Sequence, residues 1–168
     1  MNVAEAKISD LNGIMNLVHQ AQKYFKEHGI DQWQNNYPTE EVILTDIHNH
    51  ESYVLREHNQ VIAMMTLTFT EQPEYDRIDG QDWQAQAFYA TIHRLAVDNQ
   101  SKGQGLATKM LSFAAEKCRF LGVTSLRTDT YEKNLPMQTT LKKNGFQQRG
   151  VVKRLGVADM IGFEKIIK

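Results

Sequence analysis

The chain has 168 residues, a length that predicts one domain over residues 1–168 and a core large enough to need no disulfide or structural metal. Its 19 lysines and arginines against 20 aspartates and glutamates give a net charge of −1, which excludes the overall basic character of most nucleic-acid binders. Cys118 is the single cysteine, so an internal disulfide is excluded. No apolar run is long enough to cross a membrane, and the N-terminal residues lack an apolar signal core. We therefore expect a cytoplasmic protein with no membrane or nucleic-acid partner.

The first half of the chain predicts a strand, two helices and a hairpin. Apolar residues recur at helical spacing from Leu11 to Phe25, and Gly29 follows as a stop signal. Thr39 is a typical N-cap, since two glutamates follow it where the helix dipole favours acids. The pair His58-Asn59 between two strand-like runs predicts a tight hairpin turn. In chain order we expect a strand over 2–8, a helix over 10–27, a short helix after Thr39, and strands over 52–57 and 60–70.

The second half begins with a polar stretch over residues 71–85, which predicts a long loop, and such loops are often functional. After it we expect a strand over 87–97, a helix over 104–121, a strand over 123–130, a helix over 135–144, and strands over 146–153 and 158–167. The strand–helix–strand unit over 87–130 requires a right-handed parallel crossover, whereas the flanking hairpins are antiparallel. The fold class is therefore α/β, with a mixed sheet and helices on both faces.

Two glycines, Gly103 and Gly105, join a predicted strand to a predicted helix. The first N–H groups of a helix have no intrahelical acceptor, and together with the helix dipole they form a site for a phosphate. Lys102 adds a positive charge, although a glycine pair at this place is equally typical of a tight turn. A P-loop motif is absent, and a dinucleotide fingerprint fails at Thr108, where glycine is required. Asp129 keeps a nucleotide-binding fold open as an alternative.

This segment resembles the central motif of the GNAT superfamily of acyl-CoA-dependent N-acyltransferases. That motif is [Q/R]-x-x-G-x-[G/A] between a strand and a helix, and residues 102–107 fit it except that Lys102 replaces glutamine or arginine. The preceding strand pattern, residues 95–98, is also similar to the family's. Asn134 and the later pair Gly145-Phe146 resemble a second family motif, so the resemblance covers roughly residues 50–150.

The resemblance implies a concrete placement of acetyl-CoA as the co-substrate. The sheet is expected to be mainly antiparallel, with a central parallel strand pair, 87–97 and 123–130, splayed to hold the CoA. The pantetheine arm pairs with the backbone of the first of these strands, and the pyrophosphate binds the N–H groups of the glycine loop. The expected cofactor-binding residues are Leu95, Ala96, Val97, Lys102, Gly103, Gln104, Gly105, Leu106, Ala107 and Asn134. Members of the family are often dimers, so the resemblance allows a homodimer.

His93 is the candidate general base, because some family members place a histidine at this part of the strand and because histidine titrates in a useful range. The alternative is a histidine packed in the sheet. Arg94 is expected on the opposite face, in a structural ion pair. The family usually places a tyrosine as general acid where this chain has Leu141, and Tyr131 is a weak substitute. Cys118 falls on an apolar helix face and is expected to be a core thiol, consistent with direct transfer.

The acceptor side is predicted from three residues. Trp33 and Tyr37 lie between the first two helices, where the family builds much of its acceptor wall. Glu74 belongs to the acidic stretch 71–85, whose charge attracts a cationic amine, although a solvated acidic loop is the simpler interpretation. His48 and His50 lack a third ligand, so no metal site is expected.

Three functions follow from these patterns. The first is an acetyl-CoA-dependent N-acetyltransferase that moves the acetyl group directly to a primary amine of a small molecule or a peptide. The second is a non-catalytic acyl-CoA-binding module, motivated by Leu141. The third is another nucleotide-phosphate binder that uses the glycine loop. Loss of turnover without loss of CoA affinity in His93→Ala separates the first from the second, and competition by ATP identifies the third.

Overall fold

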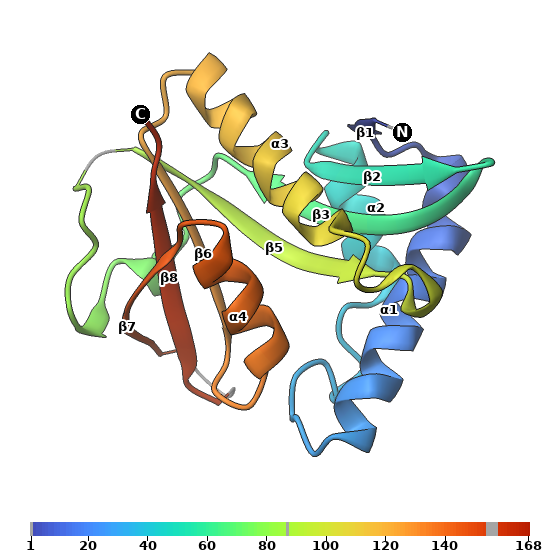
Figure 1. Cartoon of the computed structure of the whole chain (residues 1–168), viewed down its shortest axis with the longest axis horizontal. Helices are drawn as coiled ribbons and strands as arrows, with labels where there is room; N and C mark the ends of the chain where they lie inside the picture. Colours follow the sequence, from blue (N-terminus) through green and yellow to red (C-terminus); the bar gives the residue numbers. More distant parts are fainter. Residues whose placement is uncertain (1, 87, 154–157) are drawn as a thin grey trace. The chain divides into compact units, whose positions relative to one another are not determined.

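The computed structural model describes residues 2–86, 88–153 and 158–168 (Figure 1). Within them, the hydrogen-bonded strand order is β1-β2-β3-β5-β6-β8-β7-β4. The pair β5–β6 is parallel, and the pairs β1–β2, β2–β3, β4–β7, β6–β8 and β7–β8 are antiparallel. This confirms the mixed α/β fold with a mainly antiparallel sheet and one parallel pair. In chain order the elements are β1 (Val3–Glu5), η1 (Ile8–Asp10), α1 (Leu11–Glu27), α2 (Glu40–His48), β2 (Ser52–Glu57), β3 (Gln60–Thr68), η2 (Pro73–Tyr75), β4 (Ile78–Gly80), β5 (Tyr89–Val97), η3 (Asn99–Ser101), α3 (Leu106–Phe120), β6 (Ser125–Tyr131), α4 (Leu135–Lys143), β7 (Gln147–Val152) and β8 (Met160–Ile166), where η marks a short 3-10 helix.

The chain divides into two compact units. Unit 1 comprises Met1–Leu67 and Arg94–Met110, and unit 2 comprises Thr68–His93 and Leu111–Lys168. Strand β5 and helix α3 therefore each contribute residues to both units. In the described residues, no helix combines the length and the apolar character needed to span a membrane.

In unit 1, the helix cap and the hairpin turn lie at the residues where the sequence predicted them. Thr39 caps α2, since its hydroxyl accepts the Val42 N–H at 3.3 Å. His58 and Asn59 adopt φ values of +48° and +65°, the left-handed pair that a two-residue hairpin turn requires. Helix α1 contacts α2, and α2 contacts β2. In Figure 1, α2 lies behind β2 and β3, and the first turn of α3 lies in front of them.

Unit 2 corrects the expectation of a long polar loop over residues 71–85. This segment contains η2 and the short strand β4, which pairs with β7. Tyr75 and Trp83 are buried in one apolar cluster with Tyr89, Val152 and Met160. This packing was not predicted, because acidic and amide residues flank the two aromatic residues in the sequence. Lys153 pairs with Asp79 of β4 at 2.8 Å on the surface.

A buried ion network fixes the end of this segment against the sheet. Glu164 on β8 is 2% exposed and accepts hydrogen bonds from the Ser125 hydroxyl at 2.7 Å and from the N–H groups of Gln84 and Ala85. Arg127 on β6 donates to the Ala85 carbonyl at 2.6 Å. Its guanidinium carbon lies 3.9 Å from the Tyr89 ring centroid and 4.5 Å from that of Trp83. Burial lowers the pKa of Arg127, which Glu164 partly offsets.

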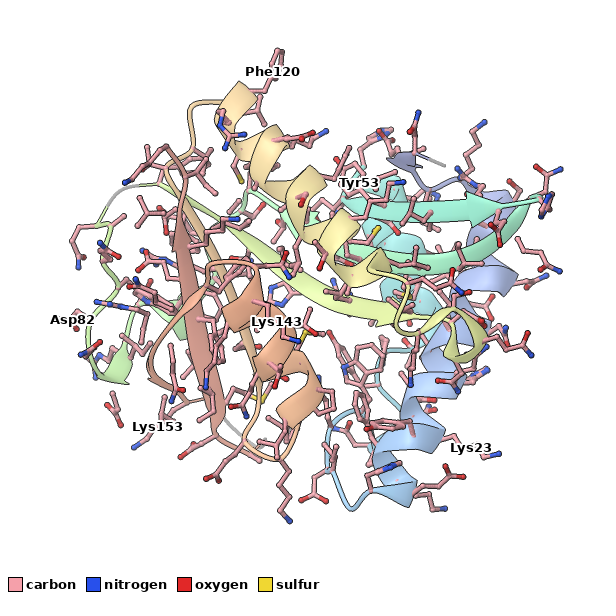
Figure 2. All side chains as sticks on the ribbon, in the orientation of Figure 1. Lys23, Tyr53, Asp82, Phe120, Lys143 and Lys153 are labelled. Carbon is pink, nitrogen blue, oxygen red and sulfur yellow. The ribbon has the colours of Figure 1, made fainter. Side chains whose placement is uncertain are left out.

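The last turn of α3 contains both a buried and an exposed side chain. Cys118 lies on its buried face, as expected for a core thiol, and burial raises the pKa of the thiol to about 11. The thiol is therefore protonated at neutral pH and is a poor nucleophile. Phe120, the last residue of the helix, is 88% exposed and extends outward in Figure 2.

Candidate functional site

The glycine loop of unit 1 has the backbone that an anion site needs. Gly103 and Gly105 adopt φ values of +80° and +75°, in the region that L side chains rarely occupy. A Cβ built on either glycine meets nothing within 4 Å, so the space beside the loop is open. The Lys109 N–H makes a helical bond to the Gly105 carbonyl at 3.0 Å. The N–H groups of Leu106 and Ala107 lie before that bond and have no acceptor within the helix.

Helix α1 holds the start of this loop in place. Gln20 donates from its amide to Asp98 Oδ1 at 2.9 Å and accepts the Asn99 N–H at 2.8 Å. The other carboxylate oxygen of Asp98 accepts the Gln100 N–H at 2.9 Å. Lys102 Nζ lies 4.3 Å from the ring centroid of Tyr24, also on α1, so its charge stays beside the loop. Sequence reasoning missed Gln20, because no local pattern links residues so far apart in the chain.

The parallel ladder between β5 and β6 is short. It pairs Tyr89 with Ser125, Ala90 with Leu126 and Thr91 with Arg127. Beyond it, the Thr128 hydroxyl donates to the Ile92 carbonyl at 2.9 Å. Strand β6 nevertheless remains paired with β8 as far as Tyr131. The ladder therefore ends before His93, and the resemblance predicts that these two strands separate to hold CoA.

Arg94 interrupts β5 with a φ of +53°, a left-handed conformation inside a strand. Such irregularities in strands concentrate beside functional sites, because they redirect side chains. Its guanidinium forms two bonds of 2.7 Å with the Asp46 carboxylate on α2, which confirms the predicted structural ion pair. It also donates to the Tyr37 hydroxyl at 2.6 Å. Leu95, Ala96 and Val97, the predicted pantetheine partners, follow directly in unit 1.

The predicted acceptor residues fall in both units. Tyr37 is half-buried in unit 1, with its hydroxyl held by Arg94. Trp33 is 9% exposed and packs edge-on against Phe25, with ring centroids 5.7 Å apart. It is therefore mainly a core residue of unit 1. Glu74 lies on η2 in unit 2 and is half-buried.

His93 is half-buried at the end of the unit 2 part of β5. Its Nε2 lies 3.2 Å from Oε1 of Gln72, a residue of the segment that precedes η2. The backbone N–H of Gln72 donates to the Tyr89 hydroxyl at 2.8 Å. The Tyr75 ring centroid lies 6.5 Å from that of the imidazole. A polar partner and an aromatic ring thus contact the imidazole from the same segment, and no sequence pattern pointed to Gln72.

The remaining unit 2 candidates lie around the start of α4. Tyr131 ends β6 and packs against the cluster that contains Tyr75 and Trp83. Its carbonyl accepts the Asn134 N–H at 3.0 Å. Asn134 is 4% exposed, and its side-chain oxygen caps α4 by accepting the Met137 N–H at 3.3 Å. Leu141 is 1% exposed, so the position where the family has a tyrosine belongs to the core here.

Comparisons with known proteins identify the family to which this chain belongs. The sequence model of the Acetyltransferase (GNAT) family matches residues 18–146 and so includes parts of both units. The chain belongs to this GNAT family. A GNAT-family acetyltransferase from Streptococcus agalactiae 2603 is 30% identical with a TM-score of 0.91, over 99% of this chain and 95% of that one. The uncharacterised N-acetyltransferase YesJ of Bacillus subtilis (strain 168) is 24% identical over 86% of this chain and 81% of its own length.

A third relative of this GNAT protein shows the fold alone. The PaiA N-acetyltransferase from Thermoplasma acidophilum, solved in complex with coenzyme A, has a TM-score of 0.74 at 16% identity. The match covers 98% of both chains. Family membership supports acetyl transfer from an acyl-CoA to an amine as the general activity.

Proposed function

We propose that this protein transfers the acetyl group of acetyl-CoA directly to a primary amine of a small molecule or a peptide. The observation that carries the proposal is the glycine loop before α3, open on one side and with helical N–H groups that have no intrahelical acceptor. The coenzyme A complex of the Thermoplasma acidophilum relative supports the same co-substrate.

The CoA contacts follow from this loop. The pyrophosphate accepts hydrogen bonds from the N–H groups of residues 102–107, and the Lys102 ammonium adds charge beside it. The backbone of Leu95, Ala96 and Val97 pairs with the pantetheine amides, since the ladder of β5 with β6 covers only Tyr89–Thr91. Asn134 lies at the thioester end and contributes its amide there.

In the proposed reaction, His93 accepts a proton from the acceptor ammonium, in part through water. The neutral amine then attacks the thioester carbonyl carbon, and the tetrahedral intermediate collapses by breaking the carbon–sulfur bond. The thiolate leaves as CoA and takes a proton from the Tyr131 hydroxyl, which stands in for the tyrosine that Leu141 replaces. The nitrogen of the new amide loses its second proton, which returns through water to the Tyr131 oxygen. The high pKa of Cys118 fits a direct transfer without an acyl-enzyme.

We propose that three residues form the binding site for the acceptor amine, each with a different role. Trp33 supports the wall of the acceptor site through its packing on Phe25. Tyr37 presents a phenol oriented by Arg94. Glu74 supplies a carboxylate that favours a cationic amine.

The test is steady-state kinetics of His93→Ala with a panel of primary amines, measured by release of the CoA thiol. Loss of a general base predicts a fall in kcat of about 10²–10⁴-fold, with the Kd of CoA unchanged. His48→Ala is the matched control, because His48 is exposed at the end of α2 and is expected to leave turnover unaffected.

Two results contradict this function in different ways. Unchanged kcat in His93→Ala removes the histidine from the mechanism. A wild-type protein that binds acetyl-CoA but releases no thiol with any amine is a binding module and not an enzyme.

A further inference from the structure

The amide of Gln72 has only one orientation that satisfies its neighbours. Its nitrogen donates to the Thr70 carbonyl at 2.9 Å, and its oxygen lies 3.2 Å from His93 Nε2. A half-turn of the amide would set two oxygens against each other at Thr70 and lose that bond. The amide oxygen therefore faces the imidazole.

Tyr89 fixes the main chain of Gln72 on both sides. Its hydroxyl accepts the Gln72 N–H at 2.8 Å and donates to the Gln72 carbonyl at 3.2 Å. Burial raises the pKa of the Tyr89 phenol, so the hydroxyl keeps its proton and both bonds persist across neutral pH. Tyr89 is itself a β5 residue, four positions before His93. The glutamine and the histidine are thus held against the same strand.

An amide oxygen only accepts hydrogen bonds, so His93 Nε2 must carry the hydrogen of this contact. A neutral imidazole has one N–H, and the lone pair then resides on Nδ1. We propose that Gln72 is a positioning residue that holds neutral His93 in the Nε2–H tautomer, so that Nδ1 is the atom that receives the proton of the acceptor amine. The second half of this inference rests on the proposed function, in which His93 is the base.

Proton transfer leaves this contact intact. When Nδ1 gains a proton, the imidazolium carries N–H groups on both nitrogens, and Nε2–H continues to donate to Gln72. A neutral amide orients the ring without the strong stabilisation of the imidazolium that a carboxylate provides. The titratable groups on the elements around the pair are Tyr75, Tyr89, Arg127, Asp129, Tyr131, Glu71, Glu74 and Asp76.

The direct test is nitrogen NMR of the imidazoles in the full-length, 15N-labelled protein, at a pH where His93 is neutral. The His93 signals are identified by their loss in His93→Ala. We expect the pattern of a protonated Nε2 and an unprotonated Nδ1 in the wild type, and loss of that preference in Gln72→Leu. A wild-type Nδ1–H pattern, or an unchanged pattern in Gln72→Leu, overturns the positioning role.

Kinetics supply the second test. Gln72→Leu is expected to lower kcat by roughly tenfold or more with little change in the KM of acetyl-CoA, since a base in the wrong tautomer cannot accept the proton. Gln72→Glu keeps the acceptor atom but stabilises the imidazolium, so the acid limb of the kcat/KM profile moves to higher pH by about one unit. Gln81→Glu adds the same charge at an exposed position of the segment and is expected to leave the profile in place.

The two proposals fail separately. If His93→Ala retains full turnover, His93 is not the base, and the NMR pattern still decides whether Gln72 sets the tautomer. If His93→Ala loses turnover but Gln72→Leu matches the wild type in both kcat and pH profile, the base assignment stands and the role of Gln72 is overturned.

Discussion

At the scale of single residues, Asp10 and Arg56 form a partly buried pair in unit 1. Arg56 Nε donates to Asp10 Oδ1 at 2.8 Å, Nη2 bonds the second oxygen, and the Lys7 N–H adds a bond at 2.6 Å. The hydrogen bond from Arg56 outweighs the cost of burial and lowers the pKa of Asp10 below its usual 3.8. A lowered carboxyl pKa stabilises the fold above the unfolded value, and this stability is lost as the pH falls through the folded value.

We therefore predict that Asp10→Asn lowers the free energy of unfolding by about 1–3 kcal/mol at pH 7 and by clearly less near pH 3. Urea unfolding at the two pH values measures the difference. Asp31→Asn, at an exposed carboxylate, serves as the control. An equal loss at both pH values would show that the pair contributes nothing through its ionisation.

Residue-scale prediction worked where the signal was local. Gly103 and Gly105 predict a left-handed backbone because few other residues tolerate it. Thr39 predicts a helix cap because its hydroxyl can accept an N–H of the first turn. Gln72 and Gln20 could not be found this way. Their roles depend on partners brought close by the fold, and glutamine is common on any surface.

At the scale of elements, β4 lies against β7 because Gly150 has no side chain. A Cβ on Gly150 would approach the Asp79 carbonyl oxygen to 2.2 Å, a backbone clash that no rotamer relieves. Gly80 pairs directly with Gly150 in the register of these two strands. The position of β4, and of the segment that carries Tyr75 and Trp83, thus depends on a glycine whose role was not visible in the sequence.

Gly150→Ala is expected to displace β4 and to destabilise the protein by about 1–3 kcal/mol. Hydrogen exchange followed by mass spectrometry should show faster exchange over residues 76–86. Gln147→Ala, at an exposed position of the same strand, is expected to leave that segment protected. Equal protection of residues 76–86 in both variants would refute the packing role of the glycine.

The sequence predicted the α-helices accurately, but it predicted some strands and missed another. Helices α1 and α3 carry strong amphipathic periods, and their ends are marked by Gly29 and Gly122 with φ values of +63° and +71°. Strand β4 has three residues and no alternating pattern, so it was missed. Short strands that depend on a partner for their geometry leave no period to detect.

At the scale of the whole molecule, the candidate residues are spread over both compact units. The glycine loop and Tyr37 belong to unit 1, whereas His93, Tyr131 and Asn134 belong to unit 2. The family match over residues 18–146 includes parts of both. The order of elements and the fold class could be predicted because each helix and most strands are locally encoded. The acceptor could not be predicted, because the residues proposed for it lie far apart in the sequence and no local pattern links them.

The measurement that tests the central claim most directly is a thermal-unfolding titration of the wild-type protein with acetyl-CoA, CoA and ATP in parallel. A ligand that binds only the folded state adds about 2.7 kcal/mol at 100 times its Kd, which raises the Tm of a domain of this size by several degrees. We predict such a shift with acetyl-CoA and CoA, none with ATP, and a reduced shift in Gly105→Val, where a branched residue is strained at a φ of +75°. An unchanged Tm at saturating acetyl-CoA would contradict the account, because the glycine loop would then be a turn and not a binding site.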